Sequence, residues 1–311
     1  MNFRLPPLPL RTLQAFFFLL LGTLFASTQA CAEIEVVASF SILGDLAREV
    51  GGERVTVAAL VGPDQDAHVY EPRPSDARRA GRARLIVTNG LGYDDWLPRL
   101  ARSAGYTGTF AIASAGIRPL SMDKSDAHHE HTGHDERIDP HAWQDVRNVQ
   151  TYVDNIAAAL IAADPGGADT YRSNAARYRD ELARLDAEIR AAIARLPPAR
   201  RQVVSSHDAF TYFARAYGLR FLAPAGVAGN AEPGARALAR LIAQLRREKA
   251  PVFLENINDP RLMERIRNES GVAAGGTLYS DALSIASGPA PTYLAMMRHN
   301  LATLMTALEA P

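Results

Sequence analysis

Short apolar runs alternate with longer segments of helical periodicity along most of the chain. Runs of this length that are bounded by turn residues predict buried β-strands. The predicted strands are Glu35–Ser39, Val55–Val61, Leu85–Thr88, Thr109–Ala113, Gln202–Ser205, Leu219–Ala223, Pro251–Glu255 and Ala273–Leu278. Strands that alternate with helices indicate parallel sheets of the βαβ kind. Four strands before a divider and four after it predict an α/β protein with two similar lobes.

The divider is a long amphipathic pattern. The turn at 164–167 interrupts one helical segment, and apolar residues then recur at spacings of three and four from Ala168 to Leu196. Twenty-nine residues in one helix span about 43 Å, enough to connect two lobes, although an ordinary surface helix would give the same pattern. The predicted organisation is a signal peptide at 1–32, an N-terminal lobe at 33–164, a linking helix at 165–197 and a C-terminal lobe at 198–311.

The first 32 residues have the features of a secretory signal. Arg4 and Arg11 precede an apolar run that is short for a membrane span, and Ala30-Cys31-Ala32 forms a small-residue cleavage site. The sequence therefore predicts export to the periplasm. Cys31 raises the alternative of a lipoprotein, but Thr28 stands where a lipobox requires an aliphatic residue, so lipid anchoring is not expected.

Composition excludes several classes of protein. Among 311 residues, 34 are Lys or Arg and 34 are Asp or Glu, so no overall basic charge points to nucleic acid. A single cysteine excludes a disulfide framework and a cysteine-only zinc site. Half of the eight histidines lie in a polar insert at 121–137 that shows no apolar period: His128, His129, His131 and His134.

Three other histidines and one aspartate lie in distinctive motifs. His68 begins HVYEPRPSD, His141 lies in DPHAW, His207 lies in SSHDAF and Asp281 lies in YSDALS. His207 and Asp281 directly follow predicted strands and His68 follows one after a longer turn. Ligands of open parallel sheets bind at that end of the strands. Two of the four come from each half, so a site between the lobes is expected. Asp139 is a candidate to orient His141 through a hydrogen bond.

Three imidazoles and one carboxylate suit a divalent ion such as zinc, and imidazole also binds copper, nickel and iron. Four protein ligands leave no open position for a reacting water, which favours a carrier over an enzyme. A secreted zinc hydrolase is the alternative, but no HExxH motif is present.

Together, HVYEPRPSD, NGLGYDDW at 89–96, DPHAW, SHDAF and YSDALS resemble the zinc- and manganese-binding solute-binding proteins of ABC importers, the ZnuA-like and AztC-like cluster A-I. The resemblance covers nearly the whole chain after the signal segment. It implies two (βα)4 lobes joined by a rigid helix, with the metal held between them by His68, His141, His207 and Asp281. Manganese-type members of this family carry Glu at the third ligand position, so His207 implies zinc.

The resemblance also implies the remaining expectations. The chain is expected to be a monomer that binds one Zn²⁺ tightly and delivers it to a membrane permease, with a periplasmic zinc chaperone as a candidate loading partner and no nucleic-acid partner. Glu255 is a candidate to support a ligand, and the four histidines of the insert are candidates for weak auxiliary zinc binding. A manganese- or iron-binding homologue and a metal-dependent surface adhesin are the alternative functions.

Overall fold

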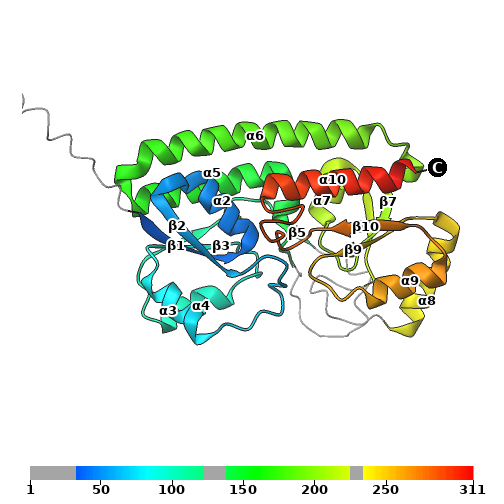
Figure 1. Ribbon diagram of the computed structural model, residues 1–311, viewed down its shortest axis with the longest axis horizontal. Coiled ribbons are helices and arrows are strands. Elements are labelled where there is room, and N and C mark those ends of the chain that lie inside the picture. The colour runs from blue at the N-terminus through cyan, green and yellow to red at the C-terminus, as the bar shows by residue number, and fades with distance from the viewer. Residues whose placement is uncertain (1–32, 122–137, 225–233, 311) are drawn as a thin grey trace, which may run out of the picture. The chain divides into compact units, whose positions relative to one another are not determined.

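The computed structural model describes residues 33–121, 138–224 and 234–310. Figure 1 shows two parallel sheets with a long helix, α6 (Ala168–Ala194), running past both of them. The first sheet has the strand order β2-β1-β3-β4 and the second has the order β10-β9-β7-β8. Neighbouring strands in each sheet are parallel. The predicted α/β fold with two four-stranded parallel sheets and a long helix is therefore confirmed.

All eight predicted strands are present, with ends that shift by one residue at most. The strands of the two sheets are β1 (Ile34–Phe40), β2 (Val55–Val61), β3 (Leu85–Thr88), β4 (Thr109–Ile112), β7 (Gln202–Val204), β8 (Arg220–Leu222), β9 (Val252–Glu255) and β10 (Ala274–Leu278).

Nine α-helices and four 3-10 helices connect these strands in the described part of the chain. Besides α6, the α-helices are α2 (Ser41–Gly51), α3 (Pro74–Arg82), α4 (Trp96–Ser103), α5 (Val146–Ala163), α7 (Thr211–Tyr217), α8 (Ala235–Glu248), α9 (Arg261–Ser270) and α10 (Tyr293–Glu309). The 3-10 helices are η1 (Gly52–Arg54), η3 (Ala142–Gln144), η4 (Pro165–Gly167) and η5 (Pro198–Arg200).

The central strand of the first sheet explains why its sequence lacks polar alternation. In β1 every residue from Val36 to Phe40 is buried, because helices cover both faces of a parallel sheet. Val36 pairs with Val57 of β2 and with Leu85 of β3.

The edge strand β10 is a strand despite its poor β-propensity, and its glycines have a packing reason. A Cβ atom on Gly275 would lie 2.5 Å from the ring of Phe253 in β9, so only glycine lets the ring pack against this backbone. Gly276 has φ +104° at a register shift of the ladder, which a side chain would strain. These two glycines set the approach of β10 to β9, and β10 leads directly into the Asp281 loop.

Both sheets share one hydrophobic core. The largest buried cluster includes Val36 and Leu85 of the first sheet, Tyr178 of α6, and Phe253 and Leu278 of the second sheet. Smaller clusters lie under α8 and α9 and under α3 and α4. The predicted boundaries at 164/165 and 197/198 remain predictions, because the main core extends across them.

The polar insert differs from its prediction at its ends. Ser121 belongs to a short strand, β5 (Leu120–Ser121), which pairs antiparallel with β6 (Ile138–Asp139). A two-residue ladder has no apolar period, so periodicity could not reveal it. Residues 122–137, with the four histidines predicted to be auxiliary metal ligands, lie outside the described residues.

Candidate metal centre

The structure brings together the four side chains that the motifs predicted. His68 lies in the loop between β2 and α3, His141 lies between β6 and η3, His207 follows β7, and Asp281 follows β10. One donor atom from each residue lies within 4.8 Å of the donor atoms of the other three. Three of the four loops begin at the carboxyl ends of strands of the two parallel sheets, where such folds bind their ligands.

The donors surround the carboxylate of Asp281. Its Oδ2 atom lies 3.1 Å from Nε2 of His68 and 3.2 Å from Nε2 of His207. Nε2 of His141 lies 3.2 Å from Nε2 of His68 and 3.5 Å from Asp281 Oδ1. Four donors in a tetrahedron about 2.0–2.1 Å from one zinc ion are about 3.3 Å apart. The cluster therefore has the spacing of a single divalent-ion site.

Two of the histidines are oriented by buried carboxylates. Asp139 Oδ1 lies 2.8 Å from Nδ1 of His141 and also accepts the His141 backbone N–H at 2.9 Å. Glu255 Oε2 lies 2.8 Å from Nδ1 of His207, while its Oε1 accepts the backbone N–H groups of Ser206 and His207. A carboxylate on Nδ1 keeps a proton there and leaves Nε2 as the donor to a metal. Asp139 thus lies where that role requires, and Glu255 Oε2 lies within ion-pair distance of His207 Nδ1 without forming a hydrogen bond among the described residues.

The electrostatics of the cluster favour a cation. Burial lowers the pKa of His141, but the charges of Asp281 and Asp139 outweigh it and raise this pKa to about 9. For His207, burial is likewise outweighed by Glu255 and Asp281, which raise its pKa well above 6.5. Burial opposes ionisation of Asp281, yet the two histidines hold its pKa well below 3.8. These shifts mean that the cluster attracts positive charge, which either protons or a metal ion can supply.

Aromatic side chains close the inner side of the cluster. The ring of Tyr93 lies 4.9 Å from the ring of His68 and 5.0 Å from that of Trp143. Trp143 Nε1 and Gln144 Nε2 both donate to the backbone oxygen of Ser280, at 2.9 and 2.7 Å. These contacts tie the segment after His141 to the residue before Asp281, which explains why a Trp lies two residues beyond the ligand.

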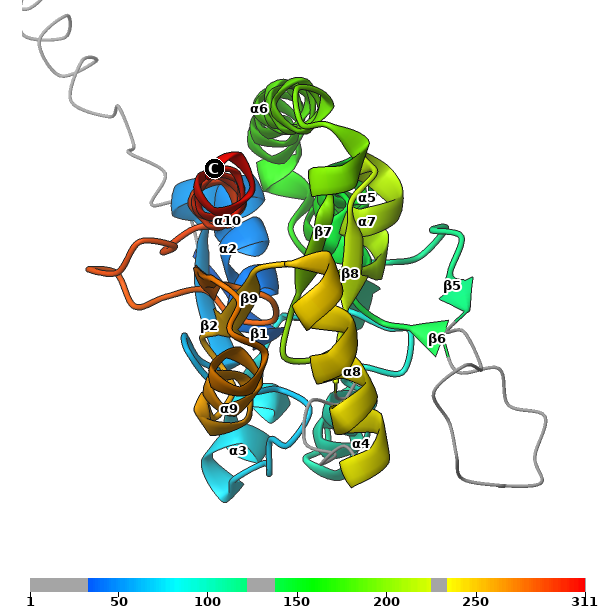
Figure 2. The ribbon, with the colours of Figure 1, turned by 90° about the vertical axis from the view of Figure 1, so that its right-hand side faces the viewer.

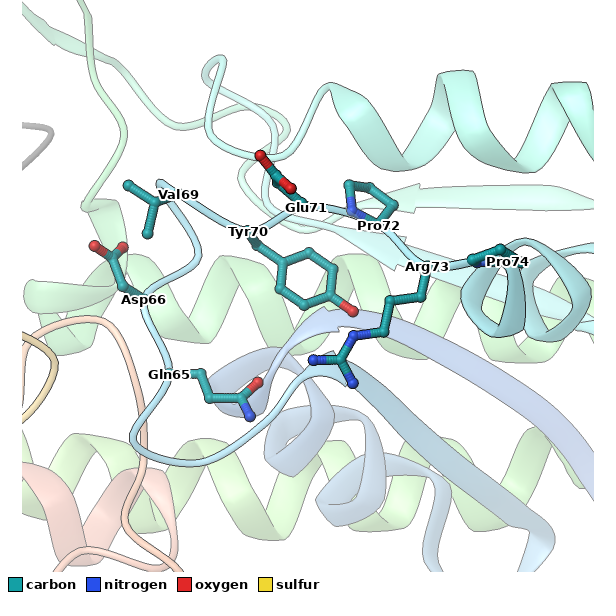
Figure 3. A pocket seen from close by; sticks show the side chains of 8 residues that line it. All are labelled: Gln65, Asp66, Val69, Tyr70, Glu71, Pro72, Arg73 and Pro74. Atoms are coloured by element: carbon teal, nitrogen blue, oxygen red, sulfur yellow. The ribbon is translucent and has the colours of Figure 1, made fainter.

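His68 is the one member of the cluster that is not fully buried. Its side chain is 9% exposed, whereas those of His141, His207 and Asp281 are 0% exposed. The backbone N–H of His68 donates to Asp66 Oδ1 at 2.8 Å. The outer side of this loop forms an open groove of about 530 Å³, shown in Figure 3, whose lining contains none of the four donors. Solvent therefore approaches the cluster past His68.

Sequence reasoning did not assign two residues beside the cluster. Tyr93 packs on His68, and its buried hydroxyl has no hydrogen-bond partner among the described residues. Burial raises the pKa of Asp66, and the charge of Asp281 raises it further. Tyr93 lies in NGLGYDDW, which carried the resemblance without a stated role, whereas an acid two residues before a histidine is too common to be a signal.

Comparison with known proteins decides the family. The family profile described as "ZnuA: Zinc-uptake complex component A periplasmic" matches residues 36–307. The chain belongs to the ZnuA family. As a ZnuA-family member it is an extracytoplasmic, metal-binding solute-binding protein of an ABC importer and not an enzyme, as the sequence predicted. The permease and ATPase of such an importer are its working partners.

Named relatives of this ZnuA-family chain bind different metals. It is 33% identical to the manganese-binding lipoprotein MntA of Halalkalibacterium halodurans, over 89% of each chain, and 31% identical to the iron-binding protein YfeA of Yersinia pestis, over 93% and 94%. The solved structure of the periplasmic zinc-binding protein TroA from Treponema pallidum superposes with a TM-score of 0.81 at 28% identity, covering 89% of this chain and 99% of TroA.

Two expectations of the sequence analysis are not supported by these relatives. Several curated relatives are named as manganese or iron binders, so the zinc subtype is not confirmed. MntA and others are named lipoproteins, which conflicts with the expectation that Cys31 is not lipidated. Within the described residues no helix is both long and apolar enough to cross a membrane, and Cys31 lies outside them.

Proposed function

We propose that this chain captures one divalent transition-metal ion outside the cytoplasm and delivers it to the permease of an ABC importer, with His68, His141, His207 and Asp281 as its ligands. The convergence of three Nε2 atoms on one buried carboxylate supports this assignment most strongly. Asp139 and Glu255 would hold the Nδ1 protons of two ligands, as supporting carboxylates do in metal sites.

The donor set supplies one negative charge and three neutral nitrogens once the ion has displaced the protons. A divalent ion bound there by one carboxylate keeps a net positive charge. The anionic Asp139 and Glu255, which contact the Nδ1 atoms of His141 and His207, partly compensate this charge. With the inner side closed by Trp143 and Tyr93, the ion would enter and leave on the side of His68.

Manganese or iron is the ion that the names of the curated relatives favour. One feature of the site fits these ions, which accept more oxygen ligands and higher coordination numbers than zinc. Asp281 Oδ1 has no hydrogen-bond partner among the described residues, so this carboxylate can bind through both oxygens and supply a fifth donor.

Zinc is the second candidate, and the three imidazole ligands favour it. Nitrogen donors suit zinc, whereas manganese prefers carboxylate and other oxygen ligands. Affinity in vitro cannot decide between them, since zinc binds nearly any such site more tightly than manganese or iron does. The ion that the protein carries in its own compartment has to be measured instead.

The deciding experiment is metal analysis of the exported protein, purified without chelators from cells grown with equal manganese, iron and zinc. Uptake of each labelled metal is then compared in cells with and without the gene. Loss of manganese or iron uptake alone would select the first candidate, and loss of zinc uptake alone would select the second. His207→Glu, which adds an oxygen donor, should shift the bound metal toward manganese. Unchanged uptake of all three metals would contradict the proposed function.

The mature protein has two possible forms outside the cytoplasm, one lipid-anchored and one released, and they can be distinguished by experiment. The relatives named lipoproteins favour a lipid anchor on Cys31, whereas Thr28 favours cleavage after Ala32 and release into the periplasm. Mass spectrometry of the mature N-terminus separates the two, because a diacylglyceryl-modified Cys31 and a free Glu33 differ in both mass and sequence.

A further inference from the structure

Three helices on the surface carry rows of exposed arginines. Helices α3, α4 and α8 together contain nine arginines and two acidic residues. Within each helix these arginines recur at helical spacings, so they share a side. The members of the rows, which we call the arginine face, are Arg78 and Arg82 of α3, Arg99 and Arg102 of α4, and Arg236, Arg240 and Arg247 of α8. All seven are exposed.

The arginine face has little counter-charge among the residues that the structure describes: Glu248 at the end of α8 acts on Arg247 without forming an ion pair. None of its seven members takes part in an ion pair there, and the long helix α6 provides the contrast. It carries five arginines and five acidic residues. Four of its arginines form ion pairs of 2.7 to 3.0 Å: Arg172 with Asp169, Arg177 with Glu181, Arg179 with Asp154 and Arg190 with Asp186.

Folding does not account for the arginine face. Like charges three or four residues apart destabilise a helix by about 0.2–0.5 kcal/mol per pair, the amount by which opposite charges would stabilise it. The same chain places opposite charges at this spacing in α6, as in Arg177 with Glu181 and Arg190 with Asp186. The chain thus avoids repulsion between like charges on α6 and tolerates it on the arginine face. This difference indicates that the arginine face binds a partner.

The position of the arginine face relates it to the route by which the metal would enter and leave the cluster. In Figures 1 and 2, helices α3, α4 and α8 lie on the side of the sheets that faces away from α6. Helices α3 and α4 belong to the first sheet and α8 belongs to the second, so the face has a half on each side of the metal cluster. The loop that carries His68 leads directly into α3.

We propose that the arginine face docks on an acidic, outward-facing surface of the importer's permease. This inference rests on the proposed function and identifies the surface by which the protein would bind the permease. Two separate charged halves, one on the helices of each sheet, fit a partner that must bind across the cluster to receive the ion. An anionic lipid surface would also attract arginine, but it would not require a half on each side of the metal path. Complementary charge would steer the encounter and fix its orientation.

The test neutralises four arginines on each of two surfaces in the full-length chain. The face variant is R78Q/R82Q/R236Q/R240Q. Its matched control, R172Q/R177Q/R179Q/R184Q, makes the same charge change on exposed positions of α6. Each replaces the wild-type gene, uptake of labelled manganese, iron and zinc is measured in cells, and metal affinity and Tm are measured on the purified proteins.

The face variant is expected to lower uptake by about tenfold or more, while the control stays within about twofold of wild type. Both should keep wild-type metal affinity. Equal uptake by the two variants would overturn the docking proposal while leaving the proposed function intact. No metal uptake by the wild type would instead contradict the proposed function. If the face variant misfolds, R236Q/R240Q alone, on a helix that carries none of the four ligands, replaces it with the same expectation.

Vesicles distinguish lipid from protein as the partner. Purified wild-type protein is mixed with vesicles of phosphatidylglycerol or of phosphatidylcholine and sedimented. The proposal expects no arginine-dependent sedimentation with either. Sedimentation with phosphatidylglycerol that the face variant loses, together with uptake by that variant restored by fusing an additional lipid anchor, would show that the face binds the membrane and would overturn the proposal.

Discussion

His141 and His68 present the same Nε2 atom to the same carboxylate, but their surroundings differ. His141 is fully buried, and its Nδ1 lies 2.8 Å from Asp139. His68 is partly exposed, and its Nδ1 has no hydrogen-bond partner among the described residues. His207, held by Glu255, resembles His141. The cluster thus has a fixed inner part, made of His141, His207 and Asp281, and an outer ligand on a loop. The difference indicates that affinity resides in the inner part and exchange in the outer ligand.

The largest effect is expected from removing an inner ligand. A structural zinc site provides about 10–16 kcal/mol, so an equal share for each of four ligands is about 2.5–4 kcal/mol, or a factor of about 70 or more in affinity. Asp281→Asn and His141→Ala should each weaken metal binding by that much or more in a chelator-competition titration. Asp208→Asn is the milder comparison: this carboxylate accepts from Thr211 and acts on His141 and His207 through its charge alone, so its removal should cost much less affinity. An Asp281→Asn protein with wild-type affinity would show that the primary ligands are misassigned.

Acid should be the next most effective treatment. The raised pKa values of His141 and His207 mean that both imidazoles lose protons when metal binds. Because one proton displaced per ion costs a factor of ten per pH unit, metal affinity should fall about tenfold or more for each unit between pH 8 and pH 6. Titration calorimetry in buffers of different ionisation enthalpy counts the protons released. A constant affinity across this range would rule out a histidine site.

The raised pKa values of these histidines also determine how the stability of the protein changes with pH. A histidine whose pKa is raised on folding stabilises the ion-free protein below the unfolded pKa of about 6.5, and this contribution is lost as pH rises through the folded pKa of about 9. Metal stabilises the protein most where these protons are absent. The increase in Tm on adding metal should therefore be larger at pH 8 than at pH 6.

Neutralising the supporting carboxylates should have a smaller effect than removing a ligand. Asp139→Asn and Glu255→Gln remove the charge that orients His141 and His207, and such partners contribute about 10–100-fold to metal affinity. The loss should shrink at lower pH, because each substitution also lowers the pKa of its histidine and so weakens proton competition. A merely structural role would give a loss that does not vary with pH.

Removing the outer ligand should weaken binding less than removing an inner one. Water can take the fourth position that His68→Ala leaves, as it does in zinc sites with three protein ligands. The dissociation rate, measured by transfer of metal to a chromophoric chelator, should rise by a larger factor than the association rate falls. If His68→Ala weakens binding as much as His141→Ala does, the division into a fixed inner part and an outer ligand is wrong.

The smallest effect on the tight site is expected from deleting residues 125–135. Ordering such a polar segment costs about 1–2 kcal/mol per residue, so histidines carried by it should bind metal weakly. Calorimetry should show that the deletion removes weak zinc equivalents and leaves one tight equivalent. His141→Ala should do the reverse. Loss of the tight equivalent on deletion would place a primary ligand in the insert.

Sequence patterns predicted the strands and the four ligand candidates because both depend on local order. A short apolar run bounded by turn residues favours a strand through local interactions, and a histidine after a strand end lies at the ligand-binding edge of a parallel sheet. The pairing of Glu255 Oε2 with His207 Nδ1 is different. It joins residues 48 apart through the orientation of one ring, which only the packed structure fixes. The packing of Tyr93 on His68 was missed for the same reason.

The carbonyl oxygen of Ser280, which accepts from both Trp143 and Gln144, has a consequence for leakage. To separate His141 from Asp281, the protein would have to break two buried hydrogen bonds to one atom before any water could replace them. Spontaneous separation of these two segments is therefore costly, so we expect a bound ion to leave past the His68 loop. A carrier closed in this way retains its ion until it meets its receptor, and the receptor needs to deform only one short loop to collect the ion.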